Sequence, residues 1–138
     1  MFKVDVKIDQ KEIKKITGRL QNVEPPLKTI ARKQLDKIEN QFRTHTDPDG
    51  NKWAELKPST LRTKKVNRDR ILTRSGEMSK SFKSEVTRNS LRIYSDSEIA
   101  NYHQTGTKKM AQRKIVGFSN KDWGEIRKQL SVWVSRKK

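Results

Sequence analysis

The sequence predicts an α+β fold in which long amphipathic helices pack on a small antiparallel sheet and extended basic loops join the elements. Helices are favoured because apolar residues recur at three- and four-residue spacing in residues 24–45 and again in residues 119–136. Strands are favoured because residues 82–95 contain two short runs of strand formers around an Asn-Ser pair. A length of 138 residues predicts a single domain, residues 1–138.

The first element is a predicted strand at residues 2–8, where apolar and polar side chains alternate. Strand and helix are both possible at this end of the chain, and residues 2–8 could equally be a frayed, irregular segment that leads into the next element. Asp9 and Glu12 then have the spacing of a capping box, which predicts a short helix. Ile13, Ile16 and Leu20 would share one face of that helix over about three turns.

The second predicted helix begins at Glu24, because two prolines follow at positions that a first helical turn tolerates. It reaches to about His45. Residues 47–50, Asp-Pro-Asp-Gly, predict a turn that carries Trp53 back onto the helix and into the core. The apolar stripe of this helix comprises Leu27, Ile30, Ala31, Leu35, Ile38 and Phe42.

The middle of the chain predicts a basic, mobile loop at residues 57–70, which contain six basic side chains and little apolar periodicity. Residues 58–60 could start a short helix within it. Ser75 would cap a further turn of helix, and the hairpin at 82–95 follows.

The last third predicts a short helix at residues 98–104 that ends at Gly106, followed by a second basic, mobile loop at 106–114. Residues 115–118 are an apolar run that would form either a strand or an extended docking segment. Ser119 or Asn120 would cap the final helix. The apolar positions of that helix are Trp123, Ile126, Leu130 and Val134.

The charge of the chain is strongly basic, with 33 Lys and Arg against 16 Asp and Glu and a formal net charge of +17. Residues 1–60 contribute +4 and residues 61–138 contribute +13. Such a field attracts polyanions, either nucleic acid or the acidic face of a protein assembly. A solvated, lysine-rich surface without a partner explains the charge equally well.

Several classes of function are excluded by composition. The chain has no cysteine, which removes disulfides, thiolate zinc sites and cysteine nucleophiles and suits a reducing cytoplasm. Its longest apolar runs, residues 115–118 and 132–134, are too short to cross a bilayer. No secretory signal pattern opens the chain.

No metal, cofactor or catalytic site is predicted. The two histidines, His45 and His103, have no neighbouring ligand at metal-binding spacing. Asp47 would begin a calcium loop, but the sixth and twelfth positions, where Gly and Glu are needed, hold Lys52 and Pro58. Phosphate-binding loops and nucleophile elbows are absent, so we expect no enzyme activity.

Five short signatures lie between Phe42 and Trp123, and their order is informative. They are F-x4-D-P-D-G-x2-W-x2-L from residue 42, I-L-T-R-S-G-x-M-x2-S-F from residue 71, Y-H-Q-x-G from residue 102, M-x2-R from residue 110 and V-G-F-S-x2-D from residue 116. In this order and at these spacings they resemble the phage virion-morphogenesis, or tail-completion, family of tailed bacteriophages and Mu-like prophages.

This resemblance implies a non-enzymatic phage structural or assembly protein that completes the tail or joins tail to head by protein–protein docking. The implied partners are phage tail-tube, neck or connector proteins, with a homo-oligomeric ring in the particle, nonspecific contact with packaged DNA and no membrane. The protein would reside in the virion, and in the host bacterial cytoplasm during assembly. The alternative function is a nonspecific DNA- or RNA-binding module.

The predicted partner-binding site combines the second basic loop with the apolar run behind it. Its cations are too dense to be buried without a partner, whereas its apolar residues are too hydrophobic to remain in water. Arg113 would form a forked pair with an acidic group of the next subunit. The candidate residues are Lys108, Lys109, Arg113, Lys114, Ile115 and Phe118.

Overall fold

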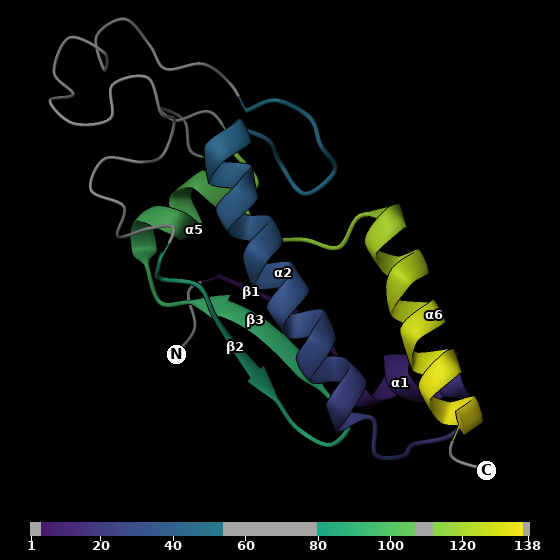
Figure 1. Ribbon diagram of the computed structural model, residues 1–138. Coiled ribbons are helices and arrows are strands. Elements are labelled where there is room, and N and C mark those ends of the chain that lie inside the picture. Colours follow the sequence, from purple (N-terminus) through teal and green to yellow (C-terminus); the bar gives the residue numbers. More distant parts are fainter. Residues whose placement is uncertain (1–3, 54–79, 107–111, 137–138) are drawn as a thin grey trace, which may run out of the picture.

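The computed structural model describes residues 4–53, 80–106 and 112–136. A three-stranded antiparallel sheet forms one layer and helices cover one of its faces (Figure 1). The long helix α2 (Glu24–Thr44) lies against strands β2 (Lys83–Val86) and β3 (Leu91–Ser95). Helix α6 (Asn120–Arg136) packs on α2 and on the short helix α1 (Gln10–Thr17). The predicted α+β class is confirmed.

The sheet has the order β1-β3-β2, so β3 is the central strand. Strand β1 (Val4–Ile8) pairs antiparallel with β3, with Val4 opposite Ser95 and Ile8 opposite Leu91. Strands β2 and β3 form the predicted hairpin, and its turn is closed by a 2.9 Å bond from the Thr87 amide to the Ser90 carbonyl. Buried and half-buried positions alternate along β3, which places one face of the sheet in the core.

Helix α1 is shorter than the sequence predicts. Asp9 caps it as expected, since its carboxylate accepts a 2.9 Å bond from the Glu12 amide. Gly18 adopts a left-handed φ of 88° and ends the helix after eight residues. The expectation that Leu20 shares the helix face is therefore wrong, and 48% of Leu20 is exposed.

Helix α2 begins and ends where the sequence predicts. It starts at Glu24 with prolines in its first turn, and His45 ends it with a φ of 59°. All six positions of its predicted stripe face the core. Five are buried and Leu35 is half-buried. Full burial of each large apolar side chain stabilises the fold by about 1.5–3 kcal/mol.

Helices α5 (Glu98–Thr105) and α6 both begin at serine caps. Ser97 accepts a 3.1 Å bond from the Ala100 amide. Ser119, and not Asn120, caps α6, because its hydroxyl accepts from the Asp122 amide at 3.1 Å. Asp122 completes a capping box by accepting from the Ser119 amide at 2.9 Å. Ile126 and Leu130 carry the buried face of α6.

Three predictions fall wholly or mostly outside the described residues. They are the basic loop at 57–70 with its short helix, the cap at Ser75, and most of the basic loop at 106–114.

Candidate docking site

The predicted docking residues lie on or beside the segment that joins α5 to α6, whose described part is residues 112–119, here called the connecting segment. It passes behind the C-terminal half of α2 in Figure 1. Gln41 of α2 fixes this crossing, because its side-chain amide donates a 2.6 Å bond to the Ile115 carbonyl. The sequence left open whether residues 115–118 form a strand, and the structure shows an irregular, extended path.

Gln104 of α5 binds the backbone of the connecting segment at three points. Its Oε1 accepts from the Ile115 amide at 2.7 Å and from the Val116 amide at 3.0 Å. Its Nε2 donates to the Val116 carbonyl at 2.9 Å. Ile115 and Val116 are buried, and buried backbone groups need partners. A single side chain thus performs the role that a neighbouring strand has in a sheet.

Trp53, which lies 61 residues before Lys114 in the chain, also supports the connecting segment. Its indole Nε1 donates to the Lys114 carbonyl at 2.9 Å, and its ring meets Phe42 edge to face at 5.3 Å. The predicted turn delivers it there, with Gly50 at a φ of 90°. The Asp47 carboxylate accepts from the amides of Asp49 and Asn51, both at 2.9 Å. The predicted core position of Trp53 is confirmed, with 5% of the residue exposed.

A glycine allows close approach at one point of this arrangement. Gly106 has a φ of 76°, and a Cβ atom there would lie 3.2 Å from the backbone of Gln112. A Cβ atom on Gly117 would lie 3.4 Å from the Pro48 ring. The first contact is tight and gives Gly106 a packing role, whereas the second is an ordinary van der Waals distance.

The structure separates the predicted docking residues into two groups. The expectation that Arg113 stays at the surface until a partner covers it is wrong, because only 7% of it is exposed. Ile115 is wholly buried in the core of its own chain. Lys114 is exposed and Phe118 is half-buried. Lys108 and Lys109 lie outside the described residues, and the docking role of this site remains a prediction.

Arg113 lies beside the buried His103. The Arg113 amide donates to the His103 carbonyl at 2.7 Å. Burial, and secondly the positive charge of Arg113, lower the pKa of His103 from 6.5 to about 4. Burial also lowers the pKa of Arg113. His103 is therefore neutral near pH 7, and within the described residues its Nδ1 has no hydrogen-bond partner.

Three contacts lie at the start of α6, at the far end of the connecting segment. Phe118 meets Trp123 edge to face at 5.1 Å, and the Arg127 guanidinium lies 6.0 Å from the centre of the Trp123 ring. Lys37 of α2 forms an ion pair with Asp122. Burial raises the pKa of Asp122. Hydrogen bonds from Lys37 and Ser119, together with the charge of Lys37, lower the pKa by more than burial raises it, so the pKa lies below its usual value of 3.8.

Sequence reasoning missed the roles of Gln41 and Gln104. Gln104 belongs to the Y-H-Q-x-G signature, so its position was visible, but its partners are 11 and 12 residues further along the chain. Gln41 lies among the apolar positions of α2 and is 3% exposed, and Gln34 is a second buried polar residue of the same helix. A polar residue inside an apolar stripe is the signal that could have identified it.

The signature residues described above shape turns, cap a helix or bind backbone groups. Among the described residues, no group of three or more His, Cys, Asp and Glu side chains is arranged to hold a metal ion. No helix in the described part of the chain is both long and apolar enough to span a membrane.

The chain belongs to the phage virion morphogenesis family, whose model matches residues 4–135. It therefore has a structural or assembly role in a phage virion. No curated protein and no solved structure matches the chain.

The environment of His103 predicts a specific pH dependence of stability. Folding lowers the pKa of His103 from 6.5 to about 4. The free energy of unfolding is therefore unaffected by this group above pH 6.5 and decreases as the pH falls from 6.5 towards 4. In that window the unfolded chain binds a proton that the folded chain does not. We expect a loss of about 1–3 kcal/mol, measured by urea unfolding at stepwise pH. His103→Gln should flatten this dependence, and an unchanged slope would contradict the assignment.

Proposed function

We propose that this protein completes the phage tail or joins the tail to the head, and that it acts by docking to other virion proteins without catalysing a reaction. The family match over residues 4–135 carries this proposal. The arrangement of the connecting segment supports it, because buried side chains hold the backbone while Lys114 faces outwards. A surface element held in this way suits protein recognition.

The partners we propose are tail-tube, neck or connector proteins of the particle. We propose that these partners form closed rings, because a protein that ends or joins a ring matches it most simply as a homo-oligomeric ring. Assembly would take place in the host cytoplasm, and the product would remain in the virion. The net charge of +17 favours one alternative function, a nonspecific DNA- or RNA-binding module.

Deletion of the gene from the phage tests this function. We expect no infectious particles, and electron micrographs of the lysate should show DNA-filled heads together with unjoined or unfinished tails. A plasmid copy of the gene should restore joined particles. Heads without DNA would favour the nucleic-acid alternative, and a normal titre of tailed particles would refute both functions.

The docking role of the connecting segment predicts the effect of Lys114→Glu. The folded state should keep its stability within about 0.5 kcal/mol, because the side chain is exposed and the Lys114 carbonyl still accepts from Trp53. The titre of complemented phage should fall at least about tenfold through like-charge repulsion at the interface. Lys33→Glu, an equal charge change at an exposed position of α2, is the control.

Arg113 is left unchanged in this test because it is buried, and its replacement would confuse folding with docking. A full titre from the Lys114→Glu phage would remove the docking role of this segment. That result would leave the family assignment unaffected.

A further inference from the structure

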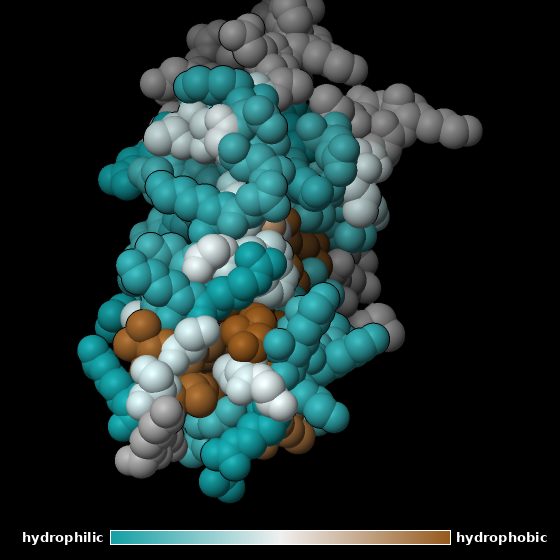
Figure 2. All heavy atoms as spheres, turned by 90° about the vertical axis from the view of Figure 1, so that its right-hand side faces the viewer, coloured by the Kyte–Doolittle hydropathy of each residue, from teal (hydrophilic) through white to brown (hydrophobic). Residues whose placement is uncertain are grey.

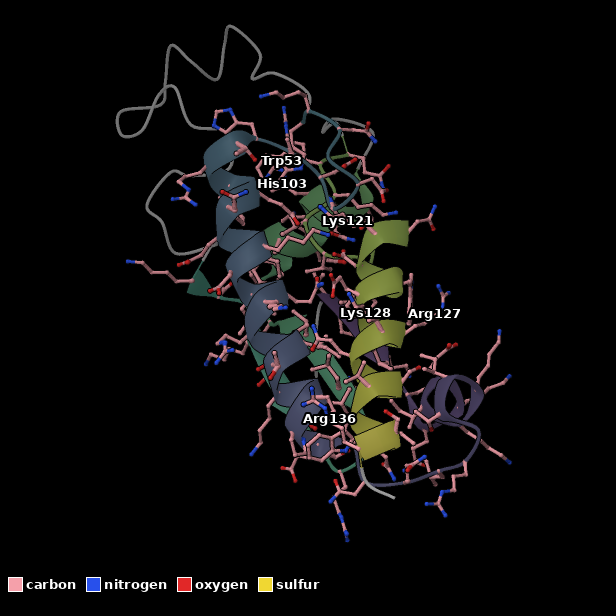
Figure 3. The ribbon with its side chains drawn as sticks, turned by 45° about the vertical axis from the view of Figure 1, so that its right-hand side comes forward. Trp53, His103, Lys121, Arg127, Lys128 and Arg136 are labelled. Carbon is pink, nitrogen blue, oxygen red and sulfur yellow. The ribbon has the colours of Figure 1, made fainter. Side chains whose placement is uncertain are left out.

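Helix α6 presents a basic outer surface. Lys121, Arg127, Lys128 and Arg136 are all exposed, and Figure 3 shows them spread from one end of the helix to the other. Of the two acidic residues of α6, Asp122 is half-buried and paired with Lys37, which leaves Glu125 as the exposed acid. Basic residues therefore outnumber acidic ones on the outer surface of α6.

Helix α1 extends this cationic surface, because it packs directly against α6. Lys11, Lys14 and Lys15 are exposed on α1, and Arg19 is exposed just after its end. We call the combined exposed surface of α1, residues 18–20 and α6 the basic face. The connecting segment precedes α6 in the chain and is not included in the basic face.

Hydrophobic side chains lie within the basic face. Leu20 and Val132 are 48% and 41% exposed, and they are two of the three large hydrophobic residues that the described part of the chain leaves exposed. Figure 2 views the molecule from this side and shows hydrophobic residues gathered in the lower half, with hydrophilic ones around them. Apolar groups inside a charged rim are the usual anatomy of a protein interface.

We propose that the basic face docks an acidic surface of a different virion protein, one that presents apolar residues flanked by Asp and Glu. The same face of a second copy does not fit, because the same cations would face one another across the contact. Duplex DNA would satisfy the cations but would leave Leu20 and Val132 without apolar partners. An acidic protein surface with an apolar centre satisfies both features.

Photocrosslinking in phage-producing cells tests the partner. Ser131 is exposed and directly precedes Val132, so p-benzoylphenylalanine at this position reports what covers the face. We expect a crosslink to one other virion protein, at a peptide with apolar residues flanked by Asp or Glu. A crosslink to a second copy of the chain, a crosslink to DNA, or no crosslink would each overturn the proposal.

Charge reversal provides a matched control. Lys121→Glu with Lys128→Glu should reduce the crosslink yield at least about tenfold, because rim charges guide association. Arg32→Glu with Lys33→Glu makes the same change on the exposed side of α2 and should leave the yield within about twofold. Val132→Ser should also lower the yield, and an unchanged yield in that variant would contradict the apolar contact. Circular dichroism establishes that each variant is folded.

These results are separable from the proposed tail function. Unjoined heads and tails after gene deletion, together with no crosslink at Ser131, would retain the function and refute this interface. A crosslink from Ser131 to an acidic virion protein, together with normal particles after gene deletion, would retain this interface and refute the tail function.

Discussion

Replacing Trp53 with alanine is expected to lower the free energy of unfolding by about 3–5 kcal/mol, the usual cost of removing a large buried aromatic side chain. Trp53 is 5% exposed, packs on Phe42 and donates to the Lys114 carbonyl. Domains of this size are stable by only about 5–15 kcal/mol, so this single change would remove much of the total. Urea unfolding followed by circular dichroism measures the loss.

Trp53→Phe separates the two contributions of this residue. It keeps an aromatic ring against Phe42 but removes the indole donor, so we expect the loss to fall to about 1–3 kcal/mol. If Trp53→Ala unfolds at the wild-type urea concentration yet abolishes particle assembly, the core position is wrong and Trp53 is an exposed anchor.

Replacing Gln104 with alanine is expected to cost about 2–4 kcal/mol and to loosen the connecting segment at Ile115 and Val116. The change leaves the buried amides of Ile115 and Val116 without their acceptor, and each unsatisfied buried group costs about 1–3 kcal/mol. Hydrogen exchange at these two amides should accelerate more than exchange in α2.

Two further variants make the Gln104 result specific. Gln104→Leu preserves most of the side-chain volume but none of the hydrogen bonds, so it should resemble Gln104→Ala. Gln112→Ala removes an exposed side chain with a single 2.9 Å bond to the Gln104 carbonyl and should change stability by less than about 0.5 kcal/mol. A stable Gln104→Leu protein with slow exchange at Ile115 would show that packing, and not hydrogen bonding, holds the segment.

The parts of the fold that follow from local rules could be predicted from the sequence. The apolar stripe of α2 and the prolines at its start determine that helix without reference to the rest of the chain. The turn before Trp53 and the hairpin depend on residues next to one another. The order of the signatures also led to the family that the comparison establishes.

The failed predictions all depend on distant contacts or on a single dihedral angle. Charge density predicts an exposed Arg113, yet the folded chain buries it beside His103. Periodicity predicts that Leu20 lies on a helix, yet the left-handed Gly18 ends α1 two residues earlier. The backbone partners of Gln104 and Gln41 lie 11 to 74 residues away, where no local pattern reaches.

The way in which the connecting segment is held has an evolutionary consequence. Gln41, Gln104 and Trp53 bind its main chain, and main-chain groups are the same whatever side chains the segment carries. Outward positions such as Lys114 are thus free to be exchanged without disturbing the loop's path, as in a scaffold that displays interchangeable recognition residues. A lineage of phages could retarget this protein to a new neighbour by altering a few surface residues, while the three anchoring side chains stay the same.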